Sequence, residues 1–216
     1  MTLTPRLELV YKKIPKKAKY IDVGSDHAYL PVILLANNII SFAIVTDIRT
    51  GPLKKSRETA IQYGVADKIK FILANGLDFD TGEFDTVSIC GMGGMLIAEI
   101  IDKATILENC LLVLQPMTKH DFLRKYLWDN SYKFTENYTL EGDKCYVVIS
   151  AKKAESKIDY NEADLYIGIP DETEKYGEAY SKYTQNLKRN LLKQKQGLKI
   201  SGKDTEFISY LINEIH

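Results

Sequence analysis

Short apolar segments alternate with longer amphipathic segments through the first 130 residues of the chain. The apolar segments are rich in β-branched residues, which favour strands, and they span residues 20–23, 42–46, 69–73, 86–90 and 111–114. The amphipathic segments carry apolar residues at helical spacing, and they span residues 29–38, 50–63, 96–101 and 119–130. This alternation predicts an α/β fold in which helices cover both faces of an open parallel sheet.

The pattern changes after residue 130. Residues 132–140 and 145–150 read as two strands, and the four-residue loop between them contains Gly142, which predicts an antiparallel hairpin. Five parallel strands followed by such a hairpin are typical of the Rossmann-like, seven-stranded fold of class I S-adenosylmethionine-dependent methyltransferases. A dinucleotide-binding dehydrogenase domain would instead add a crossover helix and a parallel sixth strand.

The last third of the chain is different in character. Residues 151–174 are polar and acidic, which indicates that they include a linker, and residues 175–198 have helical spacing with leucines at near-heptad intervals. A second apolar stripe lies at residues 207–215, with Asp204 as its expected N-cap. We therefore expect a methyltransferase domain at residues 1–154 and a small helical appendage at residues 155–216, folded as a helical hairpin.

Charge is distributed unevenly along the chain. The 29 basic residues balance the 29 acidic residues, but residues 1–19 and 186–203 are strongly basic, whereas residues 155–178 are acidic. The basic segments are candidate RNA contacts. The alternative for the second segment is a solvated helix face that pairs with the acidic segment.

Several function classes are disfavoured by what the sequence lacks. No apolar stretch approaches the roughly 18 residues of a membrane span, and no secretory signal is visible at the N-terminus. The three cysteines are widely spaced and form no metal-ligand pattern. We expect a cytoplasmic protein that has no membrane partner and no metal, while the sequence leaves its oligomeric state open.

The first motif, DVGSDHAYLP, spans residues 22–31 and follows the first predicted strand. Ligands of open α/β sheets bind beyond the carboxyl ends of the strands. A dinucleotide fingerprint starting at Gly24 would need glycines where the chain has Asp26 and Tyr29. A carboxylate there suits a cationic sulfonium and amino group better than a pyrophosphate. The alternative is a tight turn with a helix-capping aspartate.

Two further motifs lie at the ends of the second and third predicted strands. Asp47, followed by Ile48, is placed where a carboxylate accepts hydrogen bonds from both ribose hydroxyls of an adenosine cofactor. NAD-dependent proteins share this feature. Asn75 and Gly76 lie where the adenine ring is usually flanked, although Asn-Gly is also a common turn pair.

The fourth motif, GMGG, follows the fourth predicted strand. We interpret it as a loop whose small residues let a planar substrate approach the backbone. Gln115 and Pro116, after the fifth predicted strand, are expected to border the substrate pocket. The residues of GMGG complete the predicted cofactor site, which comprises Asp22, Gly24, Ser25, Asp26, His27, Asp47, Ile48, Asn75, Gly76, Gly91, Met92, Gly93 and Gly94.

Catalytic and substrate roles fall on fewer residues. Asp26 and His27 are the candidate catalytic groups. The alternative for Asp26 is a purely cofactor-binding role, and the alternative for His27 is a capping or core-contact role. The predicted substrate-binding residues are Arg6, Tyr29, Gln115, Pro116, Lys188, Arg189, Lys195 and Lys199.

The two motifs DVGSDHAYLP and GMGG, together with the spacing to Asp47, resemble the bacterial TrmK family of tRNA (adenine-22-N1)-methyltransferases. The opening helix with Arg6, the Gln-Pro pair and the helical tail are similar too. The resemblance implies that S-adenosylmethionine donates a methyl group to N1 of an adenosine in the D-arm region of tRNA. The family's site residues carried over are Gly24, Ser25, Asp26, His27, Asp47, Gly76 and Gly91 to Gly94.

Two other functions remain open at this point. A small-molecule methyltransferase would share the fold and the cofactor motifs but would need neither the basic segments nor the helical tail. A non-enzymatic RNA-binding module would explain the lysines but would leave Asp47 and the two glycine-containing motifs without a purpose. A nucleotide-dependent oxidoreductase is disfavoured by Asp26 and Tyr29 at the glycine positions.

Overall fold

The computed structural model describes residues 2–79, 82–104, 107, 109–172 and 177–215. One seven-stranded sheet has the order β3-β2-β1-β4-β5-β7-β6, in which β7 is antiparallel to its neighbours β5 and β6 and the other pairs are parallel. The strands are β1 (Tyr20–Val23), β2 (Ala43–Asp47), β3 (Ile69–Leu73), β4 (Thr86–Gly93), β5 (Leu111–Thr118), β6 (Tyr132–Glu141) and β7 (Lys144–Lys153). The predicted fold class and the terminal hairpin are therefore confirmed.

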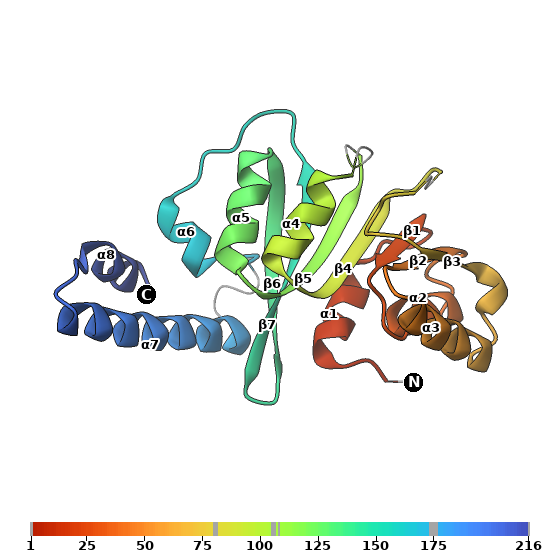
Figure 1. Ribbon diagram of the computed structural model, residues 1–216, viewed down its shortest axis with the longest axis horizontal. Helices are drawn as coiled ribbons and strands as arrows, with labels where there is room; N and C mark the ends of the chain where they lie inside the picture. Colours follow the sequence, from red (N-terminus) through yellow and green to blue (C-terminus); the bar gives the residue numbers. More distant parts are fainter. Residues whose placement is uncertain (1, 80–81, 105–106, 108, 173–176, 216) are drawn as a thin grey trace.

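Helices cover both faces of the sheet, as Figure 1 shows. On one face, α4 and α5 pack on strand residues such as Ile89 and Leu112. On the other face, α1, α2 and α3 pack on residues such as Ala43 and Val45. These helices are α1 (Pro5–Lys13), α2 (Tyr29–Ala36), α3 (Thr50–Gln62), α4 (Gly94–Asp102) and α5 (His120–Asp129), and a short 3-10 helix spans Ala66–Lys68.

The GMGG motif is not the free loop that the sequence predicts. Residues Gly91 to Gly93 belong to the end of β4, and they continue to pair with β5 through register shifts around Met92. The strand extends further because β5 also runs beyond its predicted end, to Thr118. Gly94 then begins α4, and a Cβ atom there would lie 2.3 Å from the carbonyl oxygen of Lys119. Only glycine fits at that position.

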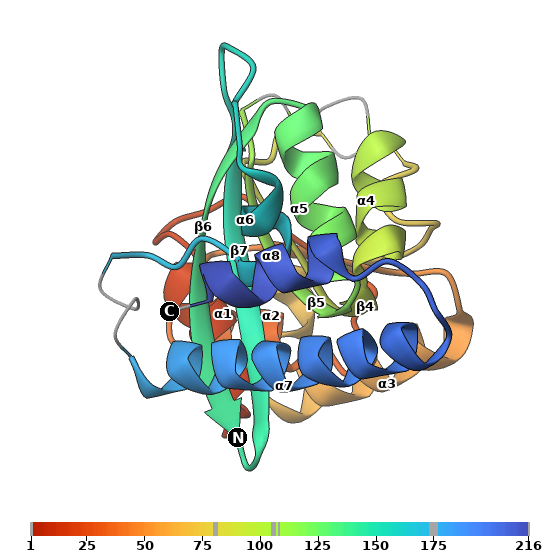
Figure 2. The same cartoon turned by 90° about the vertical axis from the view of Figure 1, so that its left-hand side faces the viewer.

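The tail consists of α6 (Glu162–Ile167), α7 (Glu178–Ile200) and α8 (Glu206–Glu214). The expected linker therefore contains a helix, whose Ala163 packs with Leu191 of α7 and Leu211 of α8. Helix α8 folds back along α7 (Figure 2), as a helical hairpin should. Its N-cap is Thr205 rather than the predicted Asp204, whose carboxylate accepts a hydrogen bond from the Glu206 N–H instead. In the described part of the chain, no helix is both long and apolar enough to cross a membrane.

Candidate active site

A cavity of about 310 Å³ opens at the carboxyl ends of β1, β4 and β5. Most of the first motif lines it, together with groups from the ends of β4 and β5 and from α1. The lining residues are Arg6, Leu7, Asp22, Gly24, Ser25, Asp26, His27, Ala28, Tyr29, Leu30, Cys90, Gly91 and Gln115. The structure thus brings together predicted residues that are up to 109 positions apart in the sequence (from Arg6 to Gln115).

Gly24 makes the sharp turn at the end of β1. Its φ angle is +73°, and a Cβ atom built there would lie 1.9 Å from the Cε atom of Met92. The Gly24 and Ser25 N–H groups both donate to the carbonyl oxygen of Thr46 on β2, at 2.7 and 3.4 Å. The Ser25 hydroxyl accepts a hydrogen bond from the N–H of Ala28. Ser25, not Asp26, therefore stabilises the turn before α2.

Asp26 extends from this turn into solvent beside two cationic or titratable side chains. One of its carboxylate oxygens lies 3.4 Å from His27 Nε2, and the other lies 3.6 Å from Lys55 Nζ. The His27 ring stacks on Tyr29 with a centroid separation of 5.0 Å and an interplanar angle of 4°. Lys55, on α3, is a neighbour of the site that the sequence motifs did not reveal.

Asp22 forms the buried floor of the cavity. Its side chain accepts hydrogen bonds from the Tyr20 and Ser88 hydroxyls, which also contact each other. Burial raises the pKa of Asp22, against the opposing effect of hydrogen bonds from Ser88, Ser25 and Tyr20. Burial also raises the pKa of the Cys90 thiol, at the end of β4, well above its ordinary value. Tyr20 and Ser88 were not identified from the sequence, since each looks like an ordinary strand residue.

Gln115 and Arg6 close the side of the cavity next to β5. The buried Gln115 side chain accepts a hydrogen bond from the Gly91 N–H at 3.2 Å and donates one to the Pro116 carbonyl at 3.1 Å. Arg6 donates to the Met117 sulfur and lies 3.7 Å from a carboxylate oxygen of Glu141 on the hairpin. Its guanidinium group also lies 5.5 Å from the ring centroid of Tyr146.

Other predicted cofactor residues lie at neighbouring strand ends, outside this cavity. The buried Asp47 accepts a hydrogen bond from the Arg49 N–H at 2.8 Å. Ile48 is 64% exposed beside it. Asn75 borders a small adjacent pocket, and the Gly76 carbonyl accepts a hydrogen bond from the Thr46 hydroxyl. Of the remaining residues of GMGG, Met92 and Gly93 end β4, and Gly94 begins α4.

The basic residues of the tail have different surroundings. Lys188 donates a hydrogen bond to the Ile215 carbonyl, which ties α7 to the end of α8. Arg189 is exposed and donates to the Asn186 side chain at 3.0 Å. Lys195 and Lys199 also lie on α7, and Lys199 is exposed.

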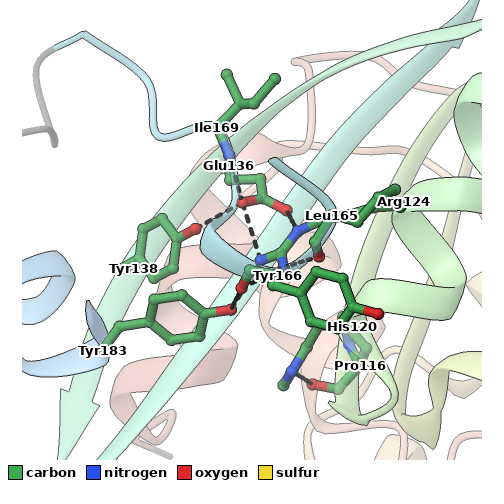
Figure 3. Close-up of polar contacts among 9 residues, drawn as sticks. All are labelled: Pro116, His120, Arg124, Glu136, Tyr138, Leu165, Tyr166, Ile169 and Tyr183. Carbon is green, nitrogen blue, oxygen red and sulfur yellow. Dashed lines mark hydrogen bonds and ion pairs between the residues drawn. The ribbon is translucent and has the colours of Figure 1, made fainter. Parts of the chain in front are cut away.

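A buried ion pair attaches the tail to the core (Figure 3). The Arg124 guanidinium, on α5, donates to both carboxylate oxygens of Glu136, on β6, at 2.7 and 3.2 Å. Arg124 also donates to the Leu165 carbonyl of α6 and to the Tyr183 hydroxyl of α7. The sequence does not indicate this pair. The hydrophobic pattern predicts an amphipathic helix around Arg124 and a strand around Glu136, but it does not show that their side chains meet.

The cavity suits a ligand that is cationic at one end. Asp22 and Asp26 provide carboxylates, Gly24 keeps the backbone open, and Asp47 stands at the next strand end. These residues fit S-adenosylmethionine, with its sulfonium, amino and ribose groups. Among the residues that the structure describes, no group of three or more His, Cys, Asp or Glu side chains is arranged to hold a metal ion.

Comparison with known proteins agrees with this geometry. Residues 3–149 match the family model of a methyltransferase domain. The chain is 35% identical to the tRNA (adenine(22)-N(1))-methyltransferase of Bacillus subtilis over 175 residues, which are 78% of this chain and 73% of that protein.

Solved structures extend the similarity over the tail. A Streptococcus agalactiae protein of the NADB-Rossmann superfamily is 31% identical, with a TM-score of 0.87 over 100% of this chain and 96% of that one. TrmK of M. capricolum, solved with S-adenosyl-homocysteine, is 26% identical, with a TM-score of 0.81 over the full length of both chains. The chain belongs to the tRNA (adenine(22)-N(1))-methyltransferase family.

Proposed function

We propose that this protein transfers a methyl group from S-adenosylmethionine to N1 of adenine 22 in tRNA. The observation that carries the proposal is the single cavity in which the turn after β1, the end of β4 and Gln115 of β5 meet. Family membership and the solved TrmK complex with S-adenosyl-homocysteine support the same reaction. The methyltransferase domain is assigned to residues 1–154 and the helical appendage to residues 155–216.

The cofactor is held by the residues that follow β1, β2 and β3. The backbone around Gly24 and Ser25 would hold its methionine part, and the Asp22 and Asp26 carboxylates would suit its amino and sulfonium groups. Asp47 would accept hydrogen bonds from the ribose hydroxyls, and Ile48, Asn75 and Gly76 would flank the adenine. Bound S-adenosylmethionine supplies an electrophilic methyl group.

The protein's contribution to the reaction is positioning. Adenine N1 carries a lone pair and is largely unprotonated at neutral pH, so it needs no strong general base. Holding N1 in line gives most of the acceleration. Methylation makes the base cationic, and the Asp26 carboxylate, beside His27, stabilises the developing charge. Lys55, 3.6 Å from Asp26, partly offsets that effect.

The RNA is bound by groups around the mouth of the cavity and on the tail. Tyr29 and the Gln115–Pro116 segment border the target base, which must leave its stack to expose N1. Arg6, Arg189, Lys195 and Lys199 contact phosphates. Lys188 contributes less, because its amine is already bonded to the Ile215 carbonyl. A tRNA substrate supports a cytoplasmic location for the protein.

The first experiment separates this proposal from its two rivals. Calorimetry measures S-adenosylmethionine binding, and transfer of labelled methyl groups is measured with unmodified tRNA transcripts. We expect heat with the cofactor alone and label in tRNA. Absence of cofactor binding would favour an RNA-binding module. Cofactor binding without label in any tRNA would favour a small-molecule methyltransferase.

A further inference from the structure

A second and larger cavity lies beside the first. Its volume is about 570 Å³, and its walls come from the end of β5, the start of α5, the β6–β7 hairpin and α7. Its lining residues are Pro116, Met117, His120, Asp143, Lys144, Cys145, Tyr146, Tyr183, Asn186, Leu187, Arg189 and Asn190. We call it the hairpin groove. Its volume falls within the usual range for small-molecule sites, about 300–1,000 Å³.

The two cavities share a wall. Gln115 lines the first cavity, and the next two residues, Pro116 and Met117, line the hairpin groove. Arg6 lines the first cavity and contacts Met117 and Tyr146, which line the groove. A molecule seated in the first cavity is therefore separated from the hairpin groove by only a few side chains.

The chemistry of the hairpin groove suits a nucleotide. Lys144 on the hairpin and Arg189 on α7 supply positive charge from two different elements, against one acid, Asp143. Asn186 accepts a hydrogen bond from Arg189 at 3.0 Å and so orients it. Tyr146 offers an aromatic ring from β7. Cations combined with an aromatic ring and amides are what single-stranded RNA sites use.

The buried ion pair fixes the width of the hairpin groove. Tyr183 lines the groove, and its hydroxyl donates to the Tyr166 carbonyl and accepts from Arg124, which is itself paired with Glu136. His120 contacts the Tyr183 ring edge-on and is bonded to the Pro116 carbonyl (Figure 3). Helix α7 is thus held at a set distance from β5, which makes the groove a preformed site.

We propose that the hairpin groove binds a nucleotide adjacent to the target adenine, with its base on Tyr146 and its phosphate between Lys144 and Arg189. The inference rests on the proposed function, because it assumes that the substrate is RNA with an extruded adenine. An extruded nucleotide remains linked to its two neighbours through phosphates. The shared wall places one of these neighbours at the groove.

A double-mutant cycle between protein and RNA tests this assignment. The protein carries Tyr146→Ala, and the tRNA transcript carries an abasic nucleotide at position 21 or at position 23. The readout is Kd for the RNA. Loss of stacking on one base weakens binding by about five- to 150-fold. We expect one of the two abasic positions to weaken wild-type binding in this range but to have little further effect on Tyr146→Ala.

The controls separate stacking from general damage. Tyr63→Ala removes an exposed tyrosine outside the groove, and its effect on Kd should multiply with that of each abasic site. Tyr146→Phe should restore the coupling. The cycle also cancels any effect of the abasic site on tRNA folding. The inference would be overturned if the effects of Tyr146→Ala and of the abasic nucleotide on Kd multiplied at both positions. It would also be overturned if Tyr146→Ala bound S-adenosylmethionine more weakly than the wild type.

Failure of the proposed function has a different signature. Kd for RNA is measured without methyl transfer, so the coupling is scored independently of activity. Absence of methylation by the wild type, with coupling present, would reject the reaction but retain the nucleotide site. Normal methylation without coupling would reject the hairpin groove alone.

Discussion

Replacing Arg124 with methionine should destabilise the protein more than most single substitutions do. Arg124 and Glu136 are fully buried, and the arginine donates to the carboxylate and to groups of α6 and α7. Removing it leaves the Glu136 carboxylate buried, and among the residues that the structure describes only the Tyr138 hydroxyl and the Ile169 N–H still donate to it (Figure 3). Breaking one partner of a buried ion pair costs about 3–5 kcal/mol.

The assay is chemical and thermal unfolding of the wild type, Arg124→Met and the double variant Arg124→Met/Glu136→Leu. For a chain of this size, 1 kcal/mol shifts Tm by about 2–4 °C, so the single variant should melt about 6–20 °C lower. The double variant should recover most of this loss, because no unpaired charge stays buried. The reasoning is refuted if the single variant loses less than about 1 kcal/mol, or if the double variant is the less stable of the two.

Three other predictions follow from single sites. Gly24→Ala should weaken S-adenosylmethionine binding at least tenfold in calorimetry, because the new Cβ atom meets Met92 at a φ of +73°; unchanged Kd would contradict the role of this turn. Burial raises the pKa of the Asp22 carboxyl, so folding favours its protonated form. The stability that this carboxyl contributes is fully present at pH values below the ordinary carboxyl pKa and is lost as pH rises through the raised pKa. Urea titrations should show Asp22→Asn gaining stability relative to the wild type over that rise, and a constant difference would count against the burial argument. Arg189→Ala should lower the slope of log K against log salt for tRNA binding by about 1. Lys188→Ala should leave this slope unchanged, because the Lys188 amine is hydrogen-bonded to the Ile215 carbonyl. Equal slopes for the two variants would contradict the phosphate contact assigned to Arg189.

The sequence predicts the sheet well because its strands are short, apolar and separated by turn residues. The fully buried strands β1 and β2 are continuous apolar runs apart from Asp22, Thr46 and Asp47. The motifs that we predict to bind the cofactor follow the ends of these strands, so their place in the fold is predictable for the same reason. It fails at GMGG, where glycines usually indicate a loop but here pair with an extended β5.

Contacts between distant elements are beyond what a single sequence indicates. Arg124, Glu136 and Tyr183 are separated by 12 to 59 positions and come from three elements. Taken alone, Arg124 and Glu136 are of a polar type that is usually found at the protein surface. The sequence does not predict helix α6, which lies in an acidic segment, because its six residues are too few to show helical periodicity. The hairpin groove arises only when these contacts set α7 against the hairpin.

Reverse transcription of tRNA after reaction with S-adenosylmethionine tests the central claim most directly. A methyl group on N1 blocks the Watson–Crick edge of adenine and stops the polymerase. We predict a stop at position 22 that appears only with enzyme and cofactor and disappears when adenine 22 is replaced. Incorporated methyl label without this stop, or a stop that survives replacement of adenine 22, would contradict the account.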